Sequence, residues 1–127
     1  MITEDYVSFE TAKLLKEKGF DDNCASLYDL RNGEFSQRGV GYIFNNGQWD
    51  NFITAPTLQM VMKWLREVHN LEIYPYHVMF QENNKWWYEI EKVTKGCSNC
   101  QYEEEPIYST YEEACESAIK YCLENLI

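Results

Sequence analysis

The order in which two hydrophobic periodicities alternate along the chain is the strongest constraint on its fold. Apolar residues recur at the spacing of a helical face in residues 8–18, 56–70 and 109–126. Between these segments, residues 24–53 and 73–93 have the character of strands, and turn residues rather than helices interrupt them. Strands that follow one another directly form hairpins. We therefore predict an α+β fold, with an antiparallel sheet built from hairpins and three helices packed mainly on one face.

The length and composition fit one α+β domain that spans residues 1–127. A chain of 127 residues has the usual size of a single domain and can bury a substantial core. Hydrophobic residues make up 45% of the chain and aromatic residues 16%, which is too apolar for an intrinsically disordered protein. No shift in composition indicates a boundary between two domains.

The three expected helices carry recognisable signals at their ends. Ser8 can cap the first helix, and Ser109 or Thr110 can begin the third as part of a capping box. Pro56 suits the first helical position of the second helix, where a missing N–H costs nothing. The second helix has the clearest apolar face, formed by Leu58, Val61, Met62, Leu65 and Val68. The face of the third comprises Tyr111, Cys115, Ala118, Ile119, Cys122 and Leu126.

Three hairpins are expected between the helices. Asn-Gly pairs favour tight turns because both residues tolerate a positive φ. The expected hairpins join residues 25–30 to 34–35 through Asn32-Gly33, 40–44 to 48–53 through Asn46-Gly47, and 73–80 to 86–93 through a loop over 81–85.

The last of these strands has two faces of different character. Alternation directs Trp86, Tyr88 and Ile90 toward the core, and it leaves Trp87 on the outer face among carboxylates. An exposed tryptophan is a good anchor for a protein interface. The candidate interface residues are Trp87, Trp49, Trp64, Glu89 and Glu91.

The charge of the chain excludes several classes of partner. The net charge is -10, from 21 acidic and 11 basic residues. Direct binding to nucleic acid or to an anionic membrane surface requires clustered Lys and Arg, so we expect neither. The amino terminus has no basic region and no apolar run of a signal peptide, and no stretch is apolar for long enough to span a membrane. These features predict a cytoplasmic location.

Three segments of the chain carry a resemblance to a known group of proteins. They are the segment from Ser8 to Phe20, the run Ala55-Pro56-Thr57-Leu58-Gln59 leading into residues 63–70 (KWLREVHN), and the Tyr-Glu-Glu-Ala run of residues 111–114. Together they resemble small uncharacterised proteins of Bacteroides phages and prophages, over most of the chain. The resemblance implies an origin in a phage or mobile element, and it implies no activity.

The cysteines and histidines do not form a recognisable catalytic or cofactor motif. Cys97 and Cys100 form a lone Cys-x-x-Cys, which could be a redox pair or half of a zinc site, although acidic residues follow it closely. Cys24 could act as a nucleophile with His69 or His77 as its base, but no motif brings them together. We therefore assign no catalytic, cofactor-binding or metal-binding residue, and metal binding by the Cys97–Cys100 pair stays an open question.

These observations favour a non-enzymatic accessory protein that acts through protein–protein contact or self-association. The alternative is an acidic inhibitor or mimic that binds a basic nucleic-acid-binding protein of the host, as the charge of -10 suggests. A zinc-stabilised module and an enzyme of unknown class remain further hypotheses.

Overall fold

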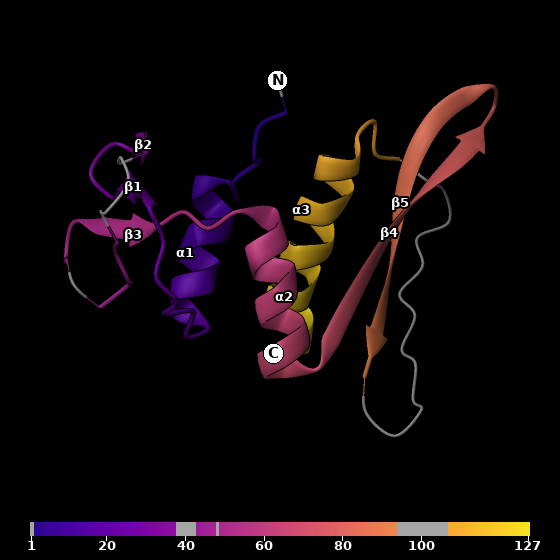
Figure 1. Ribbon diagram of the computed structural model, residues 1–127. Coiled ribbons are helices and arrows are strands. Elements are labelled where there is room, and N and C mark those ends of the chain that lie inside the picture. The colour runs from indigo at the N-terminus through magenta and orange to yellow at the C-terminus, as the bar shows by residue number, and fades with distance from the viewer. Residues whose placement is uncertain (1, 38–42, 48, 94–106) are drawn as a thin grey trace. The chain divides into compact units, whose positions relative to one another are not determined.

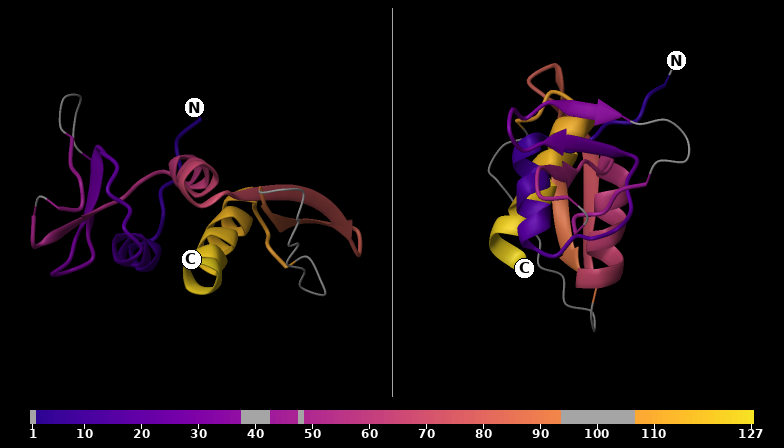
Figure 2. Two further views of the ribbon diagram at one scale, coloured as in Figure 1. Left: turned by 90° about the horizontal axis from the view of Figure 1, so that it is seen from below. Right: turned by 90° about the vertical axis from the view of Figure 1, so that its left-hand side faces the viewer.

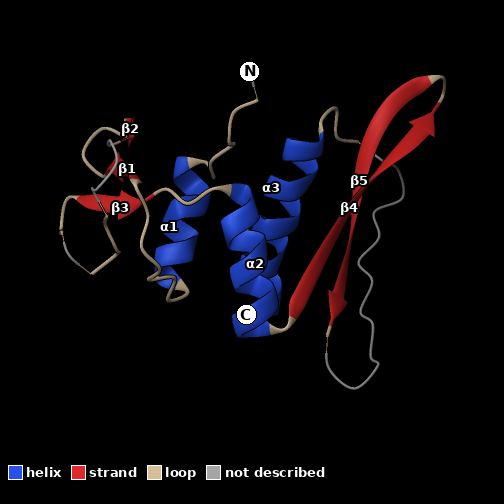
Figure 3. Ribbon diagram, in the orientation of Figure 1, coloured by secondary structure: helices blue, strands red, loops and turns tan. Residues whose placement is uncertain are grey.

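The computed structural model describes residues 2–37, 43–47, 49–93 and 107–127 (Figure 1). The chain divides into two compact units, Met1–Thr57 and Leu58–Ile127, each of which combines helical structure with an antiparallel sheet. The predicted α+β class is therefore confirmed (Figure 3). The prediction of a single domain over residues 1–127 stays a prediction, because two compact units can belong to one domain.

The first unit combines one helix with a three-stranded sheet. Helix α1 (Phe9–Glu17) begins after Ser8, whose hydroxyl accepts a hydrogen bond from the Thr11 amide, so the predicted cap is confirmed. Strands β1 (Ser26–Asp29), β2 (Phe35–Gln37) and β3 (Phe52–Thr54) form an antiparallel sheet in the order β2-β1-β3. Helix α1 contacts β3 and buries Thr11, Ala12 and Leu15.

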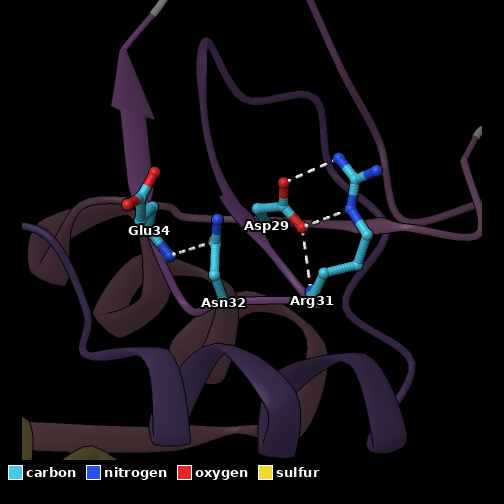
Figure 4. A network of polar contacts seen from close by, with 4 residues as sticks. All are labelled: Asp29, Arg31, Asn32 and Glu34. Carbon is cyan, nitrogen blue, oxygen red and sulfur yellow. Dashed lines mark hydrogen bonds and ion pairs between the residues drawn. The ribbon is translucent and has the colours of Figure 1, made fainter.

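The turn between β1 and β2 is held by side chains of its own residues (Figure 4). The Arg31 guanidinium donates to both carboxylate oxygens of Asp29, at 2.8 and 3.0 Å, and the Arg31 amide donates to the same carboxylate. Asn32 accepts from the Glu34 amide through its side-chain oxygen, and Gly33 has a φ of 74°. The Asn-Gly pair thus forms the predicted hairpin, with Gly33 in the region that disfavours other residues.

The pairing of β3 corrects two expectations. The sequence pattern pairs residues 48–53 with 40–44, whereas β3 pairs with β1 in the register Leu27↔Thr54. Residues 40–42 lie outside the described part of the chain, and Phe44 forms an isolated bridge with Cys24. The described strands also form two sheets, of three and two strands, and not the one expected sheet.

The second unit packs two helices against a long hairpin. Helix α2 (Leu58–His69) starts two residues after Pro56, so Pro56 lies before the helix and not at its first position. Asn70 follows α2 with a φ of 57°, the left-handed conformation that commonly closes a helix. Helix α3 (Tyr111–Tyr121) is capped by Thr110, which accepts from the Glu113 amide, as one of the two predicted capping boxes requires. A π-helical segment, η1 (Cys122–Leu126), continues α3.

Strands β4 (Leu71–Phe80) and β5 (Asn83–Lys92) form the hairpin, and they twist about each other in the views of Figures 1 and 2. Their register runs from Leu71↔Lys92 at the base to Phe80↔Asn83 at the tip. The expected five-residue loop over 81–85 is therefore wrong, since the turn consists of Gln81 and Glu82. A loop closing at Phe80 and Trp86 would have shifted the register by three residues.

The core of the second unit lies between the helices and one face of the hairpin. Both α2 and α3 contact β4, and α3 also contacts β5. Every apolar residue expected on the inward face of α3 from Cys115 to Cys122 is fully buried. No helix within the described residues is both long enough and apolar enough to cross a membrane.

Candidate interaction surface

The β4–β5 hairpin has one face in the core and one face that points away from it. Alternation along the strands puts Leu71, Ile73, Tyr88 and Ile90 on the inner face, and all four are buried. The outer face carries polar and aromatic residues whose side chains are half-buried or exposed, with one exception considered below. The predicted inward direction of Tyr88 and Ile90 is therefore confirmed, and Trp86 on the same face is half-buried.

Three carboxylates and one tyrosine gather on the outer face at the base of the hairpin. Glu72 lies opposite Glu91, and Tyr74 lies opposite Glu89. We call these four residues the acidic hairpin face. Directly opposed side chains have Cβ atoms about 5 Å apart, so the carboxylates repel one another at close range. This repulsion destabilises the isolated hairpin. A bound cation would reduce the repulsion, and the same negative charges attract it.

An arginine and a tyrosine contact carboxylates of the acidic hairpin face. The Arg66 guanidinium on α2 contacts Glu72 at 3.2 Å. Tyr74 is 45% exposed, and partial loss of water, followed by the charges of Glu91 and Glu72, raises the pKa of its hydroxyl, which also donates a hydrogen bond to Glu91. The acidic hairpin face therefore carries three carboxylates, of which that of Glu72 is paired with Arg66.

The tip of the hairpin is a second exposed feature. Met79 is 64% exposed, and it lies two positions before the first turn residue, Gln81. Gln81 and Glu82 have φ values of 49° and 64°, which are uncommon for residues other than glycine, asparagine and aspartate. Non-glycine residues held in this region cost about 1–3 kcal/mol each and are common at functional sites. An exposed methionine beside a strained turn suits a contact surface.

The predicted outward position of Trp87 is wrong. Although it belongs to the outer face by alternation, Trp87 is 3% exposed. Its ring stacks on those of Tyr88 and Tyr108, with centroids 5.0 and 6.0 Å away. Tyr108, from the segment before α3, packs on the rings of Trp87 and Tyr88 and pairs with the backbone of Trp86. Trp87 is therefore a packing residue, since covering by an element distant in the sequence overrides alternation.

The other two candidate tryptophans differ from each other. Trp64 on α2 is 6% exposed and packs edge-on against the His69 ring at 4.7 Å. Trp49 is 55% exposed, in the unit that does not contain the hairpin. Of the candidate interface residues, Glu89 and Glu91 thus lie together on the acidic hairpin face. Glu72 and Tyr74 were missed, because the expected five-residue loop did not bring them opposite these glutamates.

The cysteines that the structure describes are unsuited to nucleophilic chemistry. Cys24, Cys115 and Cys122 are free and buried. Burial raises the pKa of Cys24 and of Cys115 to about 11, and that of Cys122 to about 12. Thiols with such values are protonated at neutral pH, and the thiolate is the reactive form. Cys97 and Cys100 lie outside the described residues.

Each of the two histidines packs edge-on against a tryptophan ring. His77 Nε2 lies 2.8 Å from the side-chain oxygen of Asn84, and its ring packs edge-on against Trp86. His69 ends α2 near a cavity of about 100 Å³ lined by Leu71, Ile90, Lys92 and Leu126. Within the described residues, no group of three or more His, Cys, Asp or Glu side chains could hold a metal ion.

Comparison with known proteins does not assign the chain to a family. No family model, curated protein or solved structure matches it. The functional argument therefore starts from the chemistry of the hairpin.

Proposed function

We propose that the chain is a non-enzymatic accessory protein that binds a partner protein through the acidic hairpin face and the hairpin tip. The observation that supports this proposal is the gathering of Glu72, Glu89 and Glu91 around Tyr74, which is 45% exposed, on the outer face of the hairpin. Its partner carries an exposed segment rich in arginine or lysine.

The chemistry of the face selects such a segment. Carboxylates accept hydrogen bonds from guanidinium groups in a bidentate manner, which gives both affinity and orientation. The half-exposed ring of Tyr74 can also receive a cation over its face. The excess of acidic residues over the whole chain steers a basic partner toward it at low ionic strength.

Mimicry of DNA is the weaker alternative. A mimic requires a long, regular row of negative charge, as along a phosphate backbone. On the described outer face, the carboxylates occupy the base of the hairpin, and the middle carries Tyr76 and Trp87. This distribution favours contact with a short basic segment over contact with a surface that binds nucleic acid. A cytoplasmic location and a phage or mobile-element origin belong to the same proposal.

Titration with an oligoarginine peptide, followed by NMR, tests the proposal. Amide shifts should concentrate in β4 and β5, and affinity should fall as salt is added. The double variant Glu89→Gln/Glu91→Gln should weaken binding about tenfold, since each exposed ion pair contributes about 0.2–1 kcal/mol. The matched control Glu112→Gln/Glu124→Gln removes the same charge from exposed positions of α3 and η1 and should change binding little.

Two results would contradict the proposal. One is an equal loss of affinity in both double variants, because binding would then depend on net charge and not on the hairpin. The other is an absence of shifts in β4 and β5 at low salt. An oligoglutamate peptide serves as the negative control for the probe.

A further inference from the structure

The outer edge of β4 carries backbone groups that the hairpin itself does not use. The described sheet of this unit has two strands, so β4 has a neighbouring strand on one side only. Trp86 of β5 exchanges backbone hydrogen bonds with Tyr108, at 2.8 and 3.3 Å, and therefore directs its N–H and C=O away from β4. In an antiparallel pair, residues opposite each other direct these groups the same way, either both inward or both outward. His77 lies opposite Trp86, so His77 and, two residues on, Met79 direct their N–H and C=O groups to the outer edge.

The part of β4 near the turn extends beyond the helices of this unit (Figures 1 and 2). Leu71, Ile73, His77 and Met79 share one face of the strand by alternation. The first two are buried under the helices, whereas His77 is exposed and Met79 is 64% exposed. Among the described residues, the backbone groups of His77 and Met79 have no partner. Pro75, which has no N–H to donate, lies at an edge position between the two parts, as is usual for proline in a strand.

The exposed part of this edge has the composition of a segment that pairs with another strand. We call residues 76–80 (Tyr-His-Val-Met-Phe) the β4 edge. It contains no Asp, Glu, Lys or Arg, although these residues make up 25% of the chain. Aromatic and β-branched residues favour strands, and a charge or a proline on an exposed edge normally prevents unwanted pairing. The β4 edge has neither device, so its backbone groups are available as a template for another strand.

We propose that the β4 edge pairs with the same edge of a second copy of the chain, in antiparallel register about a two-fold axis at Val78. This register places His77 opposite the partner's Met79, so each such pair exchanges both of its backbone hydrogen bonds. Val78 then lies opposite its own equivalent, and Tyr76 lies opposite the partner's Phe80. Direct pairs of aromatic or β-branched side chains stabilise a sheet. The two hairpins thereby form one four-stranded antiparallel sheet.

A second copy is a suitable occupant because the β4 edge is complementary to itself. Within the paired segment, uncharged side chains face uncharged side chains, and no like charges oppose each other. A closed two-fold contact uses the same patch on both copies, as this register does. Pairing of so short a segment gives a weak dimer, and the net charge of -10 on each copy weakens it further. Added salt should therefore strengthen the dimer, whereas it should weaken the contact of the acidic hairpin face with oligoarginine.

Sedimentation velocity of the full chain, from about 10 μM to about 1 mM, tests the proposal. The dimer should form as concentration rises. Val78→Lys and Val78→Glu should each weaken it at least about tenfold, because like charges then face each other on the axis. An equimolar mixture of the two variants should restore the dimer, since Lys then faces Glu. The matched controls Val68→Lys and Val68→Glu place the same charges on α2, where Val68 is 58% exposed, and should dimerise like the wild type.

A wild-type chain that stays monomeric at about 1 mM in high salt would overturn the proposal. So would equal effects of the Val68 and Val78 substitutions, or a mixture of the Val78 variants that associates no better than either alone. Hydrogen exchange needs no variant: the amides of His77 and Met79 should exchange more slowly in the dimer, and unchanged rates would also contradict the register. Glu89→Gln/Glu91→Gln should keep the dimer while it loses affinity for oligoarginine, so this proposal and the proposed function can fail separately.

Discussion

Replacing Gln81 with Asn and Glu82 with Gly should stabilise the β4–β5 hairpin. Both residues have a positive φ, of 49° and 64°, in a two-residue turn between paired strands. Asn-Gly is the preferred pair for a turn that requires positive φ at both central positions. The double variant therefore removes strain without changing a contact of the core.

The size of the gain follows from the two residues. A left-handed conformation costs an L-residue roughly 1–2 kcal/mol, so the pair stores about 2 kcal/mol or more. The additional freedom of glycine in the unfolded chain returns about 0.5–1 kcal/mol. The net stabilisation should be about 1–1.5 kcal/mol. Each kcal/mol raises Tm by about 4 °C if the whole chain unfolds cooperatively and by about 7 °C if the second unit unfolds by itself.

Thermal melting followed by tryptophan fluorescence measures the gain, because Trp86 and Trp87 lie on β5. The variant Glu82→Gln removes the charge but keeps a non-glycine residue at the positive φ. Its Tm should therefore change by only a small fraction of the change expected for the double variant. Hydrogen exchange of amides near the turn should slow in the Asn-Gly variant. A Tm equal to or below that of the wild type would refute the view that the turn stores strain.

Three further predictions concern burial, a helix end and pH. Trp87→Ala should lower the free energy of unfolding in urea by about 3–5 kcal/mol, whereas Trp49→Ala should change it by about 0.5 kcal/mol or less; similar values would contradict the burial of Trp87. Asn70 has a φ of 57°, so Asn70→Ala should lower the free energy of unfolding by about 1 kcal/mol and thereby lower Tm, whereas Asn70→Gly should not. Equal effects of the two substitutions would show that φ is not the cause. The free energy of unfolding should also fall above pH 9.0, because burial raises the pKa of Cys24 to about 11 and that of Cys122 to about 12, while thiols of the unfolded chain already lose their protons near pH 9.0. Urea unfolding across this pH range measures the effect, and a rise in stability would contradict it.

The elements that depend on local signals were predictable. Ser8 and Thr110 begin helices because their hydroxyls accept from free amides one turn later, and Asn32-Gly33 turns the chain between β1 and β2. The inward faces of the helices follow from residue spacing. Glu89 and Glu91 were placed together on one side of a strand for the same reason, since alternation is a property of the extended backbone.

The rest of the candidate surface depends on register. A loop of five residues and a turn of two residues are both compatible with the sequence between Phe80 and Trp86, yet they place different residues opposite Glu89. The observed turn consists of Gln81 and Glu82, which are not typical turn residues and have an unfavourable φ, so the residue types do not predict a turn at this position. Burial of Leu71, Ile73 and Ile90 on the inner face is consistent with the observed register, because a slip of one residue would expose them.

What the sequence determined by itself is the set of helices, their caps and inward faces, and the first hairpin, because each depends on residues within one or two turns of each other. Tertiary structure decided that β3 pairs with β1 and that Tyr108 packs on Trp87. These outcomes join segments far apart in the sequence. The free energy of such contacts comes from packing and loss of water between the segments, which no local pattern encodes.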